Sequence, residues 1–169
     1  DSISKYLTGY TQETCNSYNM LKLTRHLFSW DASAAQADFY ERALYNHILS
    51  TQNQEKGGFV YFTPMRPGHY RVYSQPETSF WCCVGSGMEN HAKYGEMIYA
   101  HSDNDLYVNL FIPSVLKWSE KKLVIRQENN FPQEPSTKLI FDLAPKSEVN
   151  LKIRVPEWTD VSQITVSVN

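Results

Sequence analysis

The hydrophobic pattern of this chain changes its period once, and this change constrains the fold more than any other feature. In the first part, apolar residues recur every three to four positions, as Met20, Leu23 and Leu27 do, which is the spacing of an amphipathic helix. In the second part, apolar and polar residues alternate, which is the spacing of a half-buried strand. The change predicts a mainly helical part over residues 1–102 and antiparallel β-strands over residues 103–169.

The helical part contains two strong helical patterns and a weaker third one. We expect helices over residues 13–28 and 34–49, which are antiparallel because the link between them is short. The third pattern begins near Ser86 and extends to Tyr99. Residues 57–81 contain glycines and prolines that exclude a helix, so we expect a long irregular excursion there.

The second part reads as a series of short strands separated by proline and asparagine turns. This pattern is typical of an antiparallel β-sandwich. The candidate strands are Leu106–Ile112, Val115–Trp118, Leu123–Gln127, Thr137–Leu143, Val149–Val155 and Ile164–Val168. Neither part holds enough elements to cover its own apolar faces, so we expect the chain to be a fragment of a larger multidomain protein.

Composition excludes several function classes. The chain has 16 Lys and Arg against 18 Asp and Glu, a net charge of −2, so it lacks the basic surface that a nucleic-acid partner requires. No apolar run approaches the roughly 20 residues of a membrane span, and we expect no membrane partner. Three cysteines cannot form a closed set of disulfides.

The cysteines form the strongest chemical signal when they are combined with one glutamate. Glu13 and Cys15 are two positions apart, and Cys82 and Cys83 are adjacent. Three thiolates and one carboxylate can form a tetrahedral Zn²⁺ site. The spacing is not that of a zinc finger or ribbon, and free cysteines are often inert core residues. Spacing alone therefore leaves both a metal site and inert cysteines open.

The irregular excursion supplies the candidates for contact with a substrate. His69 and Tyr70 follow Pro67 and Gly68 in a segment that cannot be helical. Binding residues are often found on such loops. We therefore predict a substrate-binding role for His69 and Tyr70.

Three stretches of the chain together resemble one family of enzymes. They are Glu13-Thr14-Cys15, the segment Phe39–Asn46, and Trp81-Cys82-Cys83 with Gly85 and Asn90 beyond it. In these stretches the chain resembles the β-L-arabinofuranosidases of glycoside hydrolase families 127 and 146. The resemblance implies a segment of an (α/α)₆ barrel, the C-terminal part of a catalytic domain, followed by the start of a β-sandwich domain. It also implies a carbohydrate partner, namely an L-arabinofuranoside of plant-type glycans.

The resemblance further implies a site. Glu13, Cys15, Cys82 and Cys83 would ligate one Zn²⁺, and Cys82 would be the nucleophile of a retaining hydrolysis. The acid/base glutamate of the family precedes the Glu-Thr-Cys motif, whereas residues 1–12 contain no glutamate. We therefore expect that glutamate to lie outside this chain and the chain alone to be inactive. The chain departs from many relatives after Cys83, where they carry prolines.

Two other hypotheses remain beside the enzyme. In one hypothesis, the chain is a non-catalytic carbohydrate-binding or structural module with a structural zinc site. In the other, it is a partner-interaction domain with inert cysteines and no metal. A periplasmic or secreted location suits the breakdown of plant polysaccharides, although zinc-bound thiols are equally compatible with the cytoplasm.

Overall fold

The computed structural model describes residues 3–169 and divides the chain into two compact units. The first, here the helical unit, is Asp1–Tyr94, and the second, the β unit, is Gly95–Asn169. Helices therefore precede strands, as the change of hydrophobic period predicts. Each unit is described by itself below.

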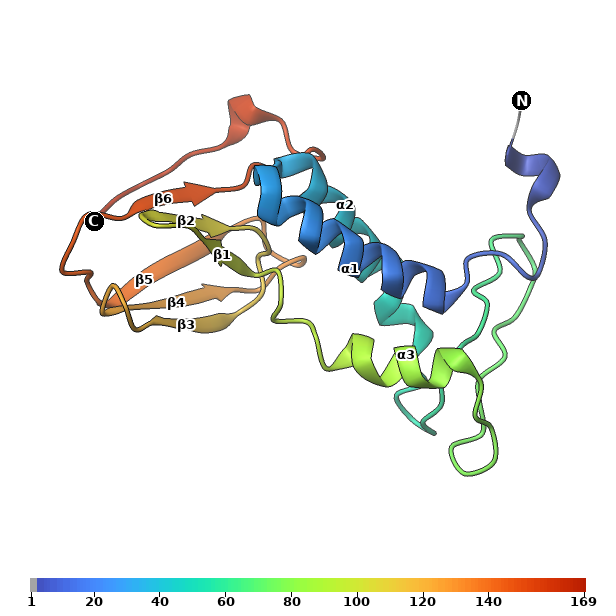
Figure 1. The fold of residues 1–169 in the computed structure, drawn as a ribbon. Coiled ribbons are helices and arrows are strands. Elements are labelled where there is room, and N and C mark those ends of the chain that lie inside the picture. Colours follow the sequence, from blue (N-terminus) through green and yellow to red (C-terminus); the bar gives the residue numbers. More distant parts are fainter. Residues whose placement is uncertain (1–2) are drawn as a thin grey trace. The chain divides into compact units, whose positions relative to one another are not determined.

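The helical unit is built around two long helices that lie side by side and run antiparallel (Figure 1). The helices and short 3₁₀ segments are η1 (Ile3–Tyr6), α1 (Thr14–Asp31), α2 (Ala34–Asn46), η2 (Ile48–Thr51) and α3 (Cys82–His91). Ala32 ends α1 with a left-handed backbone, φ 49° and ψ 39°, so the chain reverses within two residues. The prediction of two antiparallel helices is confirmed.

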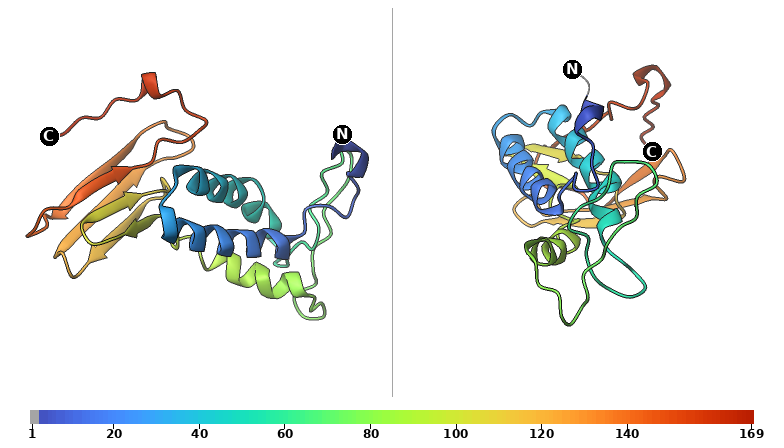
Figure 2. Two further views of the ribbon diagram at one scale, coloured as in Figure 1. Left: turned by 45° about the horizontal axis from the view of Figure 1, so that its top comes forward. Right: turned by 90° about the vertical axis from the view of Figure 1, so that its right-hand side faces the viewer.

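The third helix differs from its predicted bounds at both ends. It begins at Cys82 rather than near Ser86, and it ends at His91 rather than at Tyr99. Gly85 and Gly87 did not delay its start, because the packing of α3 outweighs their low helix propensity. Figures 1 and 2 show α3 alongside α1 and running in the same direction, so that both helices begin at the same end of the unit.

The irregular excursion between η2 and α3 is held by isolated backbone bridges rather than by a regular sheet. Gln52 pairs with Phe59, Val60 with Tyr73, and Glu13 with Phe62. The last bridge places the apolar run that begins at Phe59 beside the start of α1. The excursion thus lies beside the region where α1 and α3 begin.

The β unit contains two three-stranded sheets, with orders β1-β2-β6 and β3-β4-β5. The strands are β1 (Tyr99–His101), β2 (Asp105–Val108), β3 (Ser114–Trp118), β4 (Leu123–Asn129), β5 (Thr137–Leu143) and β6 (Asn150–Ile153), followed by η3 (Val161–Gln163). Pairing is antiparallel, as predicted, except between β2 and β6, which are parallel.

The core of the β unit is apolar and draws on both sheets. Leu106 of β2 packs in one cluster with Trp118, Leu123 and Ile125 of β3 and β4. The strand predicted at Ile164–Val168 is wrong, since this segment pairs with no strand among residues 3–169. Its alternating pattern lacks a neighbouring strand to pair with, and its valines are exposed.

One further finding concerns the helices of both units. None of the helices that the structure describes combines the length and the apolar character needed to cross a membrane.

Candidate metal centre

The start of α1 supplies two of the predicted ligands and is tied to the excursion. Glu13 occupies the N-cap position and Cys15 lies in the first turn. Between them, Thr14 donates its backbone N–H to the carbonyl of Tyr61 (3.0 Å) and its hydroxyl to the carbonyl of Val60 (2.6 Å). Thr14 is fully buried, so these two bonds hold the predicted ligands of α1 against residues 60–61.

The start of α3 supplies the other two predicted ligands. Cys82 and Cys83 are the first two residues of the helix, where unpaired backbone N–H groups favour negative charge. Gly87, further along α3, lies directly against Phe59, because a Cβ at this glycine would be 2.6 Å from the phenyl ring. Only glycine permits this close approach, which brings the start of α3 next to the excursion.

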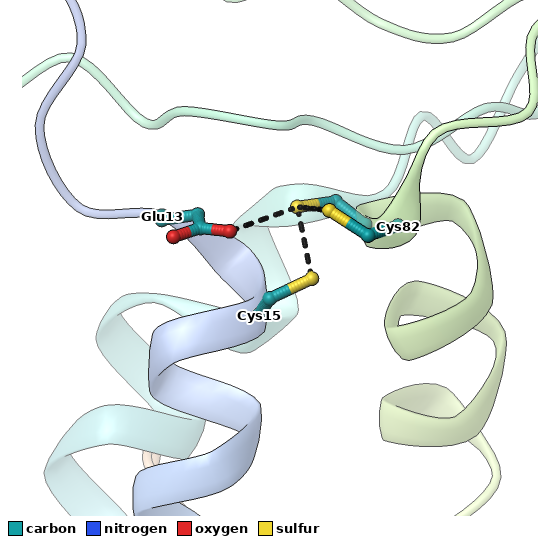
Figure 3. A group of neighbouring side chains, drawn as sticks. Glu13, Cys15 and Cys82 are labelled. Carbon is teal, nitrogen blue, oxygen red and sulfur yellow. Dashed lines mark hydrogen bonds between the residues drawn. The ribbon is translucent and has the colours of Figure 1, made fainter.

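The structure brings all four predicted ligands together. One ligand atom from each of Glu13, Cys15, Cys82 and Cys83 lies within 4.8 Å of every other. Figure 3 shows Glu13 and Cys15 at the start of α1 pointing toward Cys82 at the start of α3. The Sγ of Cys83 is central, at 3.2 Å from the Sγ of Cys15, 3.8 Å from that of Cys82 and 4.0 Å from Oε1 of Glu13.

These separations fit a tetrahedral zinc ion. With Zn–S bonds of about 2.3 Å and a Zn–O bond of about 2.0 Å, two sulfur ligands are about 3.8 Å apart and a sulfur and an oxygen about 3.5 Å. The observed S–S distances of 3.2 and 3.8 Å and the S–O distance of 4.0 Å lie within about 0.6 Å of those values. All three cysteines are free thiols, and thiolates are the ligands that favour Zn²⁺. The cluster can therefore bind a metal of this kind.

The three thiols differ in their surroundings. Burial raises the pKa of Cys15 and that of Cys83, and a side-chain hydrogen bond between the two raises the pKa of Cys83 further. Cys82 is exposed, and its hydrogen bond with the Tyr61 side chain lowers its pKa. Cys82 is therefore the thiol that ionises most readily and the one most open to solvent.

Two residues contact the thiols that the sequence did not single out. The hydrogen bond with Cys82 raises the pKa of the Tyr61 phenol to about 12, so Tyr61 remains a proton donor toward that sulfur. The hydroxyl oxygen of Ser86 lies 3.2 Å from Sγ of Cys15. Ser86 follows Cys82 by four positions in a helix, which gave a faint signal, whereas nothing in the spacing pointed to Tyr61.

His69 and Tyr70 lie elsewhere on the excursion. Both are exposed, and the His69 ring packs beside Gly9, where a Cβ would be 3.2 Å from the ring. Neither residue belongs to the four-residue cluster. Their role in substrate binding stays a prediction.

Comparison with models of known protein families identifies the family of the chain. Residues 2–96 match the model of the β-L-arabinofuranosidase GH127 catalytic domain. The chain belongs to glycoside hydrolase family 127. Residues 105–169 match the GH127 middle domain. The resemblance that the Glu-Thr-Cys and Cys-Cys motifs carry is thus confirmed.

Solved structures of GH127 enzymes have the same fold over most of this chain. One is Ara127N-Se, a GH127 β-L-arabinofuranosidase from Geobacillus stearothermophilus T6, with 25% identity and a TM-score of 0.69 over 86% of this chain and 25% of that one. Another is the GH127 β-arabinofuranosidase BT3674, with 26% identity and a TM-score of 0.71 over 90% of this chain and 24% of that one. The chain thus spans about a quarter of each relative. A comparison with curated proteins gave no match.

Proposed function

We propose that this chain is part of a retaining glycosidase that releases β-L-arabinofuranose, with Cys82 as its nucleophile. Glu13, Cys15, Cys82 and Cys83 would hold one Zn²⁺. The observation that carries the proposal is the cluster itself, four ligand atoms within 4.8 Å in a chain whose first part matches the GH127 catalytic domain. When bound, the ion would keep the thiols deprotonated and hold them in place.

The nucleophilic role follows from the differences among the thiols. Cys83 is fully buried and Cys15 is partly covered, so neither can approach a sugar as Cys82 can. In the first step, Sγ of Cys82 attacks the anomeric carbon, and the bond from that carbon to the leaving oxygen breaks. The leaving oxygen takes a proton from a general acid, which we assign to no residue of this chain. The product of this step is a glycosyl thioether on Cys82.

The second step regenerates the thiolate. Water gives a proton to the conjugate base of that general acid and attacks the anomeric carbon from the face that the aglycone left, while the carbon–sulfur bond breaks. The two displacements together retain the configuration. The sulfur departs as a thiolate, and the Tyr61 hydroxyl, already hydrogen-bonded to it, stabilises the charge that it acquires.

We further propose that the 169-residue chain alone does not hydrolyse glycosides. The only carboxylic acid in the four-residue cluster is Glu13, and as a metal ligand Glu13 is not free to donate a proton. Retaining hydrolysis requires a general acid as well as a nucleophile. The sugar partner is proposed on the same family grounds.

The first test measures zinc in the purified, reduced chain by elemental analysis. We expect one zinc ion per chain, and much less in Cys15→Ser, Cys82→Ser and Glu13→Gln. Glu77→Gln is the matched control, because Glu77 is exposed on the excursion and outside the cluster. A chain without zinc, or equal zinc in Glu13→Gln and the unmutated chain, would contradict the four-ligand site.

The second test separates a catalytic from a structural site. Iodoacetamide is added to the zinc-loaded chain, and the modified cysteine is located by peptide mass spectrometry. We expect Cys82 to react first, because it is the exposed thiol of the three. Stoichiometric zinc with an unreactive Cys82 would favour a structural zinc site in a non-catalytic module.

A further inference from the structure

The hydroxyl of Ser86 on α3 contacts the sulfur of Cys15 on α1, one of the four proposed ligands. Ser86 lies on α3, one turn after Cys82, and its Oγ is 3.2 Å from Sγ of Cys15 on α1. Only 8% of Ser86 is exposed, so water competes little for this hydroxyl. The contact joins the two helices that supply the ligands.

The position of Ser86 is fixed by the packing of its neighbour. Gly87 follows it directly and lies against the Phe59 ring so closely that a Cβ would be 2.6 Å away. This side of α3 therefore has little freedom to shift or rotate. The backbone of Ser86 is thus held close to the excursion, and its hydroxyl lies against Cys15.

The three sulfur atoms have different polar neighbours. Sγ of Cys83 lies 3.8 Å from the Tyr61 carbonyl, which is an acceptor and cannot donate a hydrogen bond to a thiolate. Sγ of Cys82 is hydrogen-bonded to the Tyr61 hydroxyl. Cys15 has the Ser86 hydroxyl. A thiolate ligand carries no proton, so in the metal-bound form Ser86 must be the donor and Cys15 the acceptor.

We propose that Ser86 is a positioning residue that acts through Cys15, donating a hydrogen bond that holds this thiolate as an unreactive metal ligand. The inference rests on the proposed metal site and adds to it a residue of α3 that binds the Cys15 sulfur and lowers the reactivity of that one thiolate. A hydrogen bond to a ligating sulfur withdraws electron density from it, which weakens its nucleophilicity and tunes its bond to the metal.

Cobalt provides a readout that a purely structural role would not change. Co²⁺ replaces Zn²⁺ in tetrahedral thiolate sites and gives sulfur-to-cobalt charge-transfer bands. Without the Ser86 hydroxyl, the Cys15 sulfur is richer in electrons and easier to oxidise. In Ser86→Ala we therefore expect these bands to move to lower energy. Alanine has the highest helix propensity, so α3 is retained.

The same variant tests reactivity and affinity. Iodoacetamide should modify Cys15 of the metal-loaded Ser86→Ala chain about tenfold faster than Cys15 of the unmutated chain, the effect of losing one hydrogen bond to a charged group. Metal affinity, measured by competition with a chelator, should fall about tenfold, the lower end for loss of an outer-shell partner.

The control is Thr24→Ala. Thr24 is also a buried hydroxyl residue, it donates to the Met20 carbonyl at 2.7 Å, and it does not contact a ligand of the cluster. We expect Thr24→Ala to leave the cobalt bands and the alkylation of Cys15 unchanged, whatever it does to stability. Equal band shifts in both variants would mean a general structural effect and would overturn the role of Ser86.

The outcomes separate the two proposals. An unmutated chain that takes up no cobalt overturns the metal site and the role of Ser86 with it. Cobalt bound by the unmutated chain, with bands and Cys15 alkylation unchanged in Ser86→Ala, overturns only the role of Ser86.

Discussion

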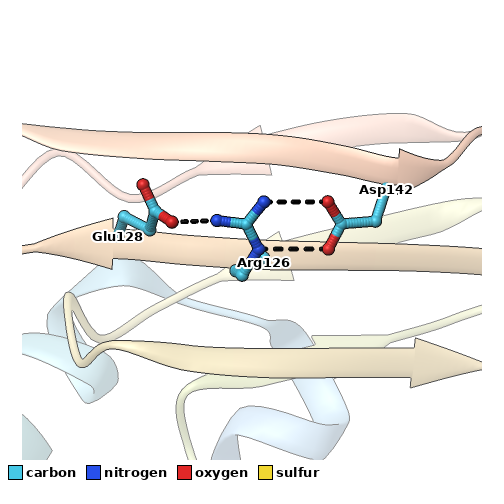
Figure 4. Close-up of polar contacts among 3 residues, drawn as sticks. All are labelled: Arg126, Glu128 and Asp142. Atoms are coloured by element: carbon cyan, nitrogen blue, oxygen red, sulfur yellow. Dashed lines mark hydrogen bonds and ion pairs between the residues drawn. The ribbon is translucent and has the colours of Figure 1, made fainter.

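The two units of this chain place their polar groups in different ways. In the helical unit, polar and ionisable groups are buried: Thr14, His47 and Thr51 are at most 1% exposed, close to the thiol cluster or to the helices that carry it. In the β unit, the core cluster is apolar, the buried polar residues among residues 3–169 are fewer, namely Asn109, Gln127 and Arg154, and Arg126 forms its ion pairs on the surface. Figure 4 shows Arg126 between Glu128 and Asp142 on β4 and β5.

This difference shows which interactions each unit depends on. Buried polar groups are stable only with their partners, so a unit rich in them is sensitive to pH, to metal and to single lost contacts. An apolar core is sensitive mainly to lost volume. The predictions below test that difference, from the largest expected effect to the smallest.

Metal removal should affect the helical unit alone. With free zinc roughly a thousandfold above its dissociation constant, binding adds about 4 kcal/mol to the free energy of unfolding of the unit that holds the site. A chelator should therefore raise hydrogen–deuterium exchange in α1 and α3 and leave β3 and β4 as they were. Equal loss of protection in both units would break the comparison.

Gly58→Ala should destabilise the helical unit by about 3 kcal/mol, through backbone strain and a steric clash. Gly58 has φ +92°, and a Cβ there would be 2.2 Å from the Ser74 carbonyl oxygen. The measurement is urea unfolding followed by exchange of the helical peptides.

Gly68→Ala separates the two causes. Gly68 also has a positive φ, +80°, but a Cβ there would meet nothing within 4 Å. It should cost only about 1 kcal/mol, from backbone strain. Equal losses in the two variants would mean that the close approach at Gly58 contributes nothing.

His47 should make the helical unit less stable in acid. Burial, with the charge of Arg71 as a second cause, lowers its pKa from 6.5 to about 4. As pH falls from about 6.5 to about 4, His47 becomes protonated in the unfolded chain but stays neutral in the folded chain. The free energy of unfolding therefore falls, by up to about 3 kcal/mol, and levels off below pH about 4.

The variant His47→Asn tests this slope. Asparagine can keep the hydrogen bond that Nδ1 shares with the Ser17 hydroxyl at 2.7 Å, but it does not titrate. Urea unfolding between pH 7 and 4 should show a shallower decline in the variant. An unchanged slope would assign the pH dependence to other groups.

Asp142→Asn should have the smallest effect. Asp142 accepts two hydrogen bonds from Arg126, at 3.0 and 3.1 Å, yet both side chains are exposed, and exposed ion pairs add little to stability. We expect thermal unfolding of the β unit to stay within error of the unmutated chain. Leu123→Ala, in the apolar core, is the positive control and should cost about 3 kcal/mol.

The sequence by itself determined the order of the fold and pointed to the four residues of the cluster. The periods of 3.6 and 2 are local properties, because a helix or strand repeats its own facing residues, so α1, α2 and most strands were predictable. Glu13, Cys15, Cys82 and Cys83 were named as ligands from their resemblance to a family, and their side chains do meet.

Only the tertiary structure decided how that cluster is assembled and what surrounds it. Cys15 and Cys83 are 68 positions apart, yet their sulfur atoms lie 3.2 Å from each other. They meet because the Thr14 hydrogen bonds and the close contact of Gly87 with Phe59 bring two helix starts and the excursion together. Long-range contacts of this kind leave no period in the sequence, so nothing pointed to Tyr61, and the position of Ser86 on the helix gave only a faint signal. For the same reason Ile164–Val168 has the pattern of a strand, but the pattern could not supply a partner to pair with.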